Sequence, residues 1–114
     1  MKKFEDLKVW KKAQSFYLDI SKEFENNKNF FFKDQILKAA LSISNNLAEG
    51  YERMSDKEFR YFLFVSKGSC GEVRSMLYLS SDLGYIEHNI ANELIEKTNE
   101  ISKMLGGLIK KMNV

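Results

Sequence analysis

Residues 55–85, SDKEFRYFLFVSKGSCGEVRSMLYLSSDLGY, have the pattern of one long helix with both ends marked. Ser55 and Glu58 have the spacing of a capping box, in which the serine oxygen accepts from the Glu58 amide and the glutamate side chain reaches back. Met54 and Phe59 are placed for the hydrophobic staple that often accompanies such a box. These signals predict that the helix begins at residue 55 or 56.

The other end of this helix is predicted at Leu83-Gly84-Tyr85. Glycine can adopt the left-handed conformation that terminates a helix, and Tyr85 could then fold back on Leu79. The segment is roughly 28 residues long, which corresponds to about 42 Å of helix.

The heptad rule divides the surface of this helix into a core side and a far side. The core positions are Leu63, Cys70 and Leu77 in one row, and Phe59, Ser66, Val73 and Ser80 in the other. The far side holds Phe64, Val65, Tyr78 and Leu79. A second apolar stripe that a monomer cannot bury is typical of a partner surface, so these residues predict a homo-oligomer interface. The alternative is that neighbouring helices cover them.

Three further helices are predicted from apolar residues recurring at steps of three and four. The first of these helices is expected to run from near Asp6 to about Phe24. The second is expected to begin after Phe30 and to end somewhere from Glu49 to Arg53. Asn89 is expected to cap the last helix of the chain. The expected core face of the first helix is Trp10, Ala13, Tyr17, Ile20 and Phe24. That of the second helix is Ile36, Ala40, Ile43 and Leu47, broadened by Leu37, Leu41 and Ala48. That of the fourth helix is Leu94, Ile101, Leu105, Leu108 and Met112.

The run Phe30-Phe31-Phe32 offers no good cap for the second helix and is interpreted as an apolar lid over one end of the molecule, in preference to a binding role. Four amphipathic helices with short connections favour an all-α fold, an antiparallel up-down-up-down four-helix bundle. The length of 114 residues fits a single domain over residues 1–114.

Composition limits the function classes. The net charge of +2 does not by itself demand a polyanionic partner, and the lone Cys70 rules out an intrachain disulfide. The acidic residues Glu5 and Asp6 stand where a signal peptide would be apolar, and no apolar run is long enough to span a bilayer. We therefore expect a cytoplasmic protein without a membrane partner.

Catalytic chemistry is not indicated. The only histidine, His88, falls in a predicted loop, and one histidine with one cysteine is too few for a zinc or di-iron site. A cysteine or serine nucleophile would lack a base, and no phosphate-binding glycine loop follows a strand. The sequence predicts no enzyme, no catalytic residues, no cofactor, no metal and no small-molecule substrate.

A row of basic residues marks one edge of the long helix. Arg60, Lys67 and Arg74 are spaced by seven, and Tyr61 and Phe64 lie close enough to stack on bases. The alternative is a solvated flank whose alkyl stems cover apolar surface. If the protein binds nucleic acid, we expect residues of the predicted second and third helices to contact the phosphates of RNA or DNA. These residues are Lys38, Arg53, Arg60, Lys67 and Arg74.

Two smaller features concern the pairing of the second and third helices. Gly68-Ser69-Cys70-Gly71 places glycines inside a helix at a cost of about 1 kcal/mol each, which predicts close approach of another helix there. A polar network between the two helices is predicted to fix their pairing, with these members: Asn45, Asn46, Glu49 and Glu72.

The whole chain also resembles a known family. The similarity runs from about Phe4 to about Lys111. Its carriers are Phe4-x-x-Leu7-x-Val9-Trp10-x-x-Ala13, Gln35-Ile36-x-Lys38-Ala39-x-x-Ser42-Ile43-x-x-Asn46-Leu47-Ala48-Glu49-Gly50, Phe59-x-x-Phe62-Leu63, Gly68-Ser69-x-x-Glu72 and Leu83-Gly84-Tyr85. In this order and spacing they resemble the four-helix-bundle proteins encoded in intervening sequences of bacterial large-subunit ribosomal RNA genes. That family includes the accessory variability protein of diversity-generating retroelements.

The resemblance implies a non-enzymatic bundle and, for the better-understood members, a barrel-like homopentamer. The retroelement relative is a basic nucleic-acid-binding subunit that works beside a reverse transcriptase. This chain departs from the pattern at Leu37 and Lys38, where two basic residues are frequent, and at Ser44, where proline is frequent. The expected function is a homo-oligomeric scaffold that contacts structured RNA or DNA phosphates. The alternative is a protein–protein adaptor that does not bind nucleic acid.

Overall fold

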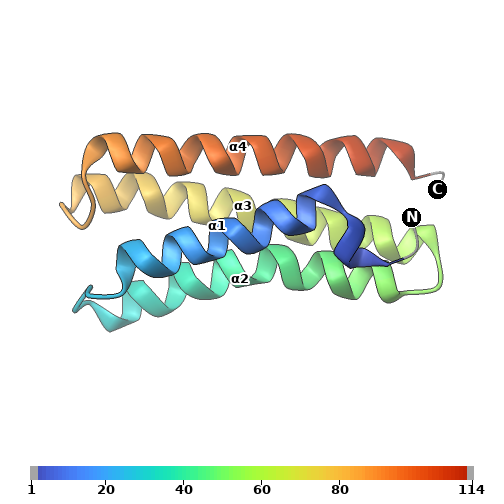
Figure 1. Ribbon diagram of the computed structural model, residues 1–114, viewed down its shortest axis with the longest axis horizontal. Helices are drawn as coiled ribbons and strands as arrows, with labels where there is room; N and C mark the ends of the chain where they lie inside the picture. The colour runs from blue at the N-terminus through green and yellow to red at the C-terminus, as the bar shows by residue number, and fades with distance from the viewer. Residues whose placement is uncertain (1–2, 113–114) are drawn as a thin grey trace.

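The computed structural model describes residues 3–112 as four long helices with a short 3₁₀ turn before the first. The turn η1 spans Phe4–Asp6, and the helices are α1 (Lys8–Phe24), α2 (Phe30–Glu52), α3 (Asp56–Asp82) and α4 (His88–Lys111). Successive helices run antiparallel along a body of 43 × 21 × 20 Å, with the start of α1 and the end of α4 at the same end of the bundle (Figure 1). The predicted up-down-up-down bundle is confirmed.

The four helices form a square in cross-section. α3 packs most extensively on α2 and next on α4, while α1 packs on α2 and α4. Within the described residues the backbones of α1 and α3 do not come close to each other, so these helices occupy diagonal corners and meet only through side chains of the shared core. The heptad assignment of α3 is confirmed at Leu63, Ser66, Cys70, Val73, Leu77 and Ser80, which are buried. The predicted core residue Phe59 is only half-buried, and Ser69 is buried although it was not predicted.

The core face of α1 differs in part from the prediction. Val9 and Phe16 are buried together with the predicted Ala13, Ile20 and Phe24. The larger predicted residues, Trp10 and Tyr17, are half-buried and pack against the edge of the core. On α2, Leu41 was predicted to broaden the core face but is 39% exposed.

Both ends of α3 are terminated by the predicted residues. Ser55 Oγ accepts from the Glu58 amide at 3.2 Å and donates to the Glu58 carboxylate at 3.3 Å. The staple prediction is wrong, because Met54 is 97% exposed. At the C-terminal end Gly84 has a φ of +74°, and the Tyr85 amide bonds the Ser80 carbonyl, as a Schellman turn requires.

The Tyr85 ring has a different partner from the predicted Leu79. It packs edge-on against Phe32 at 5.1 Å between centroids, and its hydroxyl accepts from Asn29 Nδ2 at 2.8 Å. Asn29 also caps α2, since its side-chain oxygen accepts from the Phe32 amide. The α1–α2 and α3–α4 loops are therefore joined at one end of the bundle.

The remaining end-of-helix predictions need correction. Of the aromatic run only Phe32 covers the bundle end, because Phe30 and Phe31 are 68% and 76% exposed. α4 begins one residue before the predicted cap, with His88 as its first residue and Glu87 as an N-cap that makes no side-chain bond. Within the described residues none of the helices has the length and apolar character needed to cross a membrane.

Candidate functional site

The predicted basic row on α3 lies along the edge where α3 meets α4. Lys67 approaches α4 at Gly106, where an added Cβ would lie 3.8 Å from Lys67 Cε. One heptad further on, Arg74 donates to Asn99 Oδ1 on α4 at 3.3 Å. At the other end of the row the Arg60 guanidinium lies over the Phe64 ring, 5.0 Å from its centroid.

Two lysines of α4 extend this row and were missed by the sequence reasoning. Lys103 lies between Asn99 and Gly106 at helical spacing from both, and Lys110 follows Gly106 by one turn, so both border the same edge. Their separation by seven residues is the same signal that identified the α3 row. It becomes informative only once α4 is known to pack beside that row. We call the set Arg60, Lys67, Arg74, Lys103 and Lys110 the basic edge.

The basic edge is not neutralised by ion pairs. Among residues 3–112 no carboxylate lies within 4.0 Å of these cations, whereas α1 and α4 are joined by Lys12–Glu100 at 3.0 Å and Lys97–Asp19 at 2.7 Å. Acidic residues do border the edge, since Lys103 shares a surface hollow with Glu96 and Glu100, and Asn99, which accepts from Arg74, donates to Glu96 at 3.4 Å. Within residues 3–112 the positive charge of the basic edge is therefore not offset by a direct ion pair.

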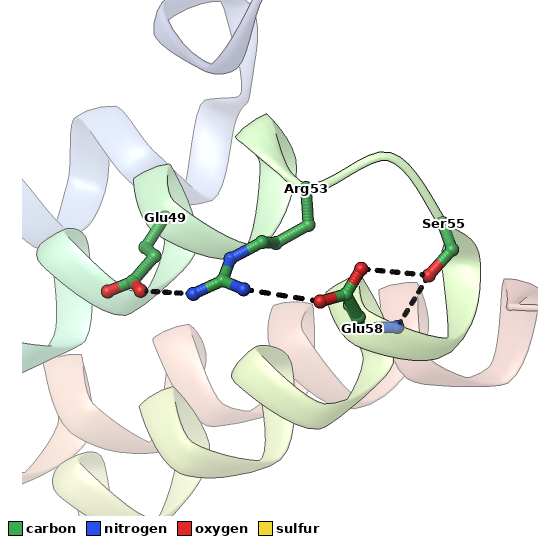
Figure 2. A network of polar contacts seen from close by, with 4 residues as sticks. All are labelled: Glu49, Arg53, Ser55 and Glu58. Carbon is green, nitrogen blue, oxygen red and sulfur yellow. Dashed lines mark hydrogen bonds and ion pairs between the residues drawn. The ribbon is translucent and has the colours of Figure 1, made fainter.

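Arg53, also predicted to contact phosphates, has a different environment. Its guanidinium donates to Glu49 Oε2 at 2.7 Å and to Glu58 Oε1 at 3.2 Å, and it lies 4.9 Å from the centroid of the Phe62 ring (Figure 2). The hydrogen bond to Glu49 and the charges of both carboxylates raise the pKa of Arg53. Two carboxylates offset its charge, so this residue joins α2 to α3 across their loop.

Lys38 lies apart from the basic edge. It is exposed on α2, and its side chain borders a shallow groove between α1 and α2 that includes Tyr17, Leu37 and Leu41. The structure thus brings Arg60, Lys67 and Arg74 together, but places Lys38 and Arg53 elsewhere.

The far side of α3 is open to solvent in the single chain. Phe64, Tyr78 and Leu79 are 48%, 58% and 49% exposed, and Val65 is half-buried. Tyr61 on the same side is 63% exposed. We call these residues the α3 outer face.

The glycines in α3 do not support the predicted close approach of another helix. A Cβ at Gly68 would meet nothing within 4 Å, and one at Gly71 would meet only Arg74 of the same helix, at 3.9 Å. The close approach occurs instead at Gly50 of α2, where a Cβ would lie 2.5 Å from Phe62 Cβ. Gly68 therefore costs helix stability, about 1 kcal/mol relative to alanine, without a compensating contact inside the chain.

The polar network between α2 and α3 has partly different members from those predicted. Asn46 Nδ2 donates to the Ser42 carbonyl and hydroxyl at 2.8 Å, and the Ser42 and Ser69 hydroxyls lie 2.9 Å apart. Ser66 Oγ donates to the Ile43 carbonyl at 2.7 Å. The other predicted members are elsewhere: Glu49 binds Arg53, and Asn45 and Glu72 are exposed.

Cys70 sits within the core beneath the basic edge. Burial raises the pKa of its thiol to about 12, although the nearby Arg74 and Lys67 act in the opposite direction. The thiol is consequently neutral at physiological pH. In the described part of the chain no group of three or more His, Cys, Asp or Glu side chains is arranged to hold a metal ion.

A profile of the 23S rRNA-intervening sequence protein family matches residues 5–107. The chain belongs to this family. A solved member of the S23 ribosomal protein family from Bacteroides thetaiotaomicron, described as a protein of unknown function, superposes with a TM-score of 0.84 at 26% identity. The superposition covers 90% of this chain and 99% of the Bacteroides chain. No curated protein matches the sequence.

Membership of the 23S rRNA-intervening sequence protein family agrees with the resemblance found from sequence, and the Bacteroides structure supports the fold. Neither comparison assigns a biochemical activity, because the solved relative is itself of unknown function.

Proposed function

We propose that this protein is a non-enzymatic homo-oligomeric scaffold that binds structured RNA or DNA through phosphate contacts. The observation that supports it best is the basic edge, where five cations from two helices have no carboxylate partner within 4.0 Å among the described residues. Lys12, Arg53 and Lys97 have carboxylate partners, and what distinguishes the basic edge is that its unpaired cations follow one line along two helices. A row of positive charges on a surface that otherwise carries both signs is suited to binding a polyanion such as RNA or DNA.

The spacing of the row suits a nucleic-acid backbone. Residues seven apart on a helix are separated by about 10 Å, so Arg60 and Arg74 lie roughly 21 Å apart along α3. That distance corresponds to about six base-pair steps at 3.4 Å each. A segment of duplex DNA could therefore meet several cations at once.

Contacts of this kind position a backbone and carry little sequence information. Lysine and arginine supply the charge, and each neutralised phosphate releases counterions, so affinity should fall steeply with salt. We accordingly propose recognition of structured RNA or DNA by shape and charge.

Self-association is proposed from the α3 outer face. Its exposed aromatic and aliphatic side chains adjoin the basic edge on the same helix, so an assembly that buries the face brings several basic edges together. Several linked edges bind one polyanion with greater avidity than a single edge does. The family resemblance supports a ring of five copies as the form of this assembly.

The test is a fluorescence titration of a structured RNA hairpin at two salt concentrations. We expect a variant with Arg60, Lys67 and Arg74 changed to alanine to bind at least tenfold more weakly at low salt. The matched control changes Lys8, Lys11 and Lys22 to alanine. These lysines are exposed on α1 and have no ion pair among the described residues, so the control removes the same charge from another side of the bundle. Equal losses in both variants, or no binding by the wild type at low salt, would overturn the nucleic-acid proposal.

A second candidate, a protein–protein adaptor, is favoured by one observation: the α3 outer face is apolar and solvent-exposed in the single chain. Light scattering separates the two functions. A protein that stays monomeric at high concentration and binds no RNA would be an adaptor, whereas an oligomer that binds RNA supports the scaffold.

A further inference from the structure

Two contacts fix the register of the two helices that carry the basic edge. α3 and α4 run antiparallel beside each other (Figure 1). Lys67 lies opposite Gly106, and Arg74 donates to Asn99. Seven residues separate these contacts on each helix, so α3 and α4 keep the same register from one contact to the other.

This register makes the cations of the two helices alternate along the edge. Lys103 lies between the two contacts, and Lys110 lies one turn beyond Gly106 on the side of Arg60. At a rise of 1.5 Å per residue, successive cations are about 4.5–6 Å apart along the bundle. The order along the edge is Arg60, Lys110, Lys67, Lys103 and Arg74. Neighbouring phosphates of one strand can therefore each meet a cation.

The strip of positive charge is narrow. Because Lys67 and Arg74 reach across to α4, the five cations form a single line. Outside this line on α4, Lys103 shares a surface hollow with the exposed Glu96 and Glu100. Outside it on α3 lies the apolar α3 outer face. The strip is consequently bordered by acidic side chains on one side and by apolar side chains on the other.

A strip of this width suits one nucleic-acid backbone and not two. A duplex can touch several of the cations with one strand, but its second backbone would lie over the acidic or the apolar border. A phosphate near Glu96 is repelled, and a phosphate over apolar side chains loses hydration without gaining a partner. A single strand needs only one line of cations, and its flexible backbone can follow a straight row.

We propose that the basic edge holds one unpaired strand of RNA or DNA in preference to a duplex. This inference rests on the proposed nucleic-acid binding and names the form of the ligand. In a structured RNA, loops and bulges supply such strands. The contacts go to phosphates, so the preference concerns the unpaired state and carries little base sequence.

The test is a pair of fluorescence anisotropy titrations at low salt, with an oligouridine strand and an RNA duplex of the same length as probes. A broad basic patch would favour the duplex, because a duplex has the higher charge density. We expect the opposite order, with the strand bound at least about threefold more tightly than the duplex.

A first variant checks that the α4 cations belong to the site. Lys103→Ala with Lys110→Ala should weaken binding of the strand by at least about fivefold, because two of the five phosphate contacts are lost. The matched control is Lys8→Ala with Lys11→Ala, which removes the same charge from exposed positions of α1. Circular dichroism checks that both variants fold, and Lys110→Ala alone replaces the double variant if it does not.

A second variant tests the acidic border. Glu96→Gln removes the negative charge, while the glutamine oxygen can still accept from Asn99. We expect the duplex to gain more affinity than the strand, so that the preference for the strand shrinks. Glu23→Gln is the matched control, because Glu23 is exposed on α1 away from the edge.

The contradicting outcomes differ in what they leave standing. If the duplex binds as tightly as the strand while alanine at Arg60, Lys67 and Arg74 still weakens binding, the preference is overturned and the nucleic-acid proposal stands. A Glu96→Gln variant that prefers the strand as strongly as Glu23→Gln does also overturns the inference. If neither probe binds the wild type at low salt, the inference and the nucleic-acid proposal fail together.

Discussion

The two contacts that α3 makes with its neighbours are built differently. Against α2 the backbones are held close, because Gly50 leaves no room for a Cβ beside Phe62, and Ser66 binds the Ile43 carbonyl. Against α4 the contact next to Gly106 is an ordinary one, and its outer border holds the cations Lys67 and Arg74.

We infer that the contact with α2 stabilises the fold, whereas the border with α4 carries the groups that bind a partner. On the α2 side Ser66 binds a buried carbonyl and Gly50 makes room for Phe62, so substitutions there should affect stability. On the α4 side the charged groups have few partners inside the chain, so their removal should affect binding and leave stability nearly unchanged. Four variants test this contrast, in order of decreasing expected effect.

The largest effect is expected at Gly50. In Gly50→Ala the added Cβ would lie 2.5 Å from Phe62 Cβ, which is fixed to the α3 backbone, so the two helices must separate. We expect a loss of roughly 1–3 kcal/mol in the free energy of unfolding, measured by urea denaturation.

The matched control for Gly50 is Gly68→Ala, where the site is open. Made in the Leu79→Glu background to exclude effects of assembly, it should raise stability by about 0.5–1 kcal/mol through helix propensity. Similar changes at the two glycines would mean that α2 and α3 are not held close at Gly50.

A smaller effect is expected from Ser66→Ala. The serine hydroxyl is fully buried and donates to the Ile43 carbonyl at 2.7 Å, and alanine would remove this bond between α2 and α3. We expect a loss of about 1 kcal/mol in the same denaturation assay. Ser75→Ala, at an exposed position of the same helix, provides the comparison, and an equal loss there would remove the special role of the buried bond.

A still smaller effect is expected for the ion pairs between α1 and α4. Lys97→Ala breaks the 2.7 Å pair with Asp19, but both side chains are substantially exposed, so we expect a loss of about 0.2–1 kcal/mol that shrinks as salt is raised. Lys103→Ala, from the same helix but without such a pair, should change stability less. A larger loss at Lys103 would show that the basic edge also holds the bundle together.

Much of this arrangement could be predicted from the sequence because its signals are local. Ser55 with Glu58 marks the start of α3, Gly84 marks its end, and the heptad rows assign its buried side without knowledge of any other helix. The Arg60–Lys67–Arg74 row is visible for the same reason, since seven-residue spacing on one helix fixes a common side.

The features that were mispredicted depend on which residues of different helices meet. Gly50 looks like an ordinary helix glycine until Phe62 is placed opposite it, and Gly68 looks like a contact site until the space around it proves empty. Arg53 has one partner, Glu49, at a spacing of one helical turn that the sequence already shows, and a second, Glu58, that only the loop brings beside it. Lys103 and Lys110 join the basic edge only through the placement of α4.

The smallest stability effect is expected at the basic edge itself. In the double variant Lys67→Ala with Arg74→Ala, only an exposed bond to Asn99 is lost, so the free energy of unfolding should change by less than about 0.5 kcal/mol. The slope of log affinity for the RNA hairpin against log salt should nevertheless fall in magnitude by about 2, one for each lost phosphate contact. A stable double variant with an unchanged salt slope would place the nucleic-acid contact elsewhere. A destabilised variant would show that α3 relies on these cations as it relies on its contacts with α2.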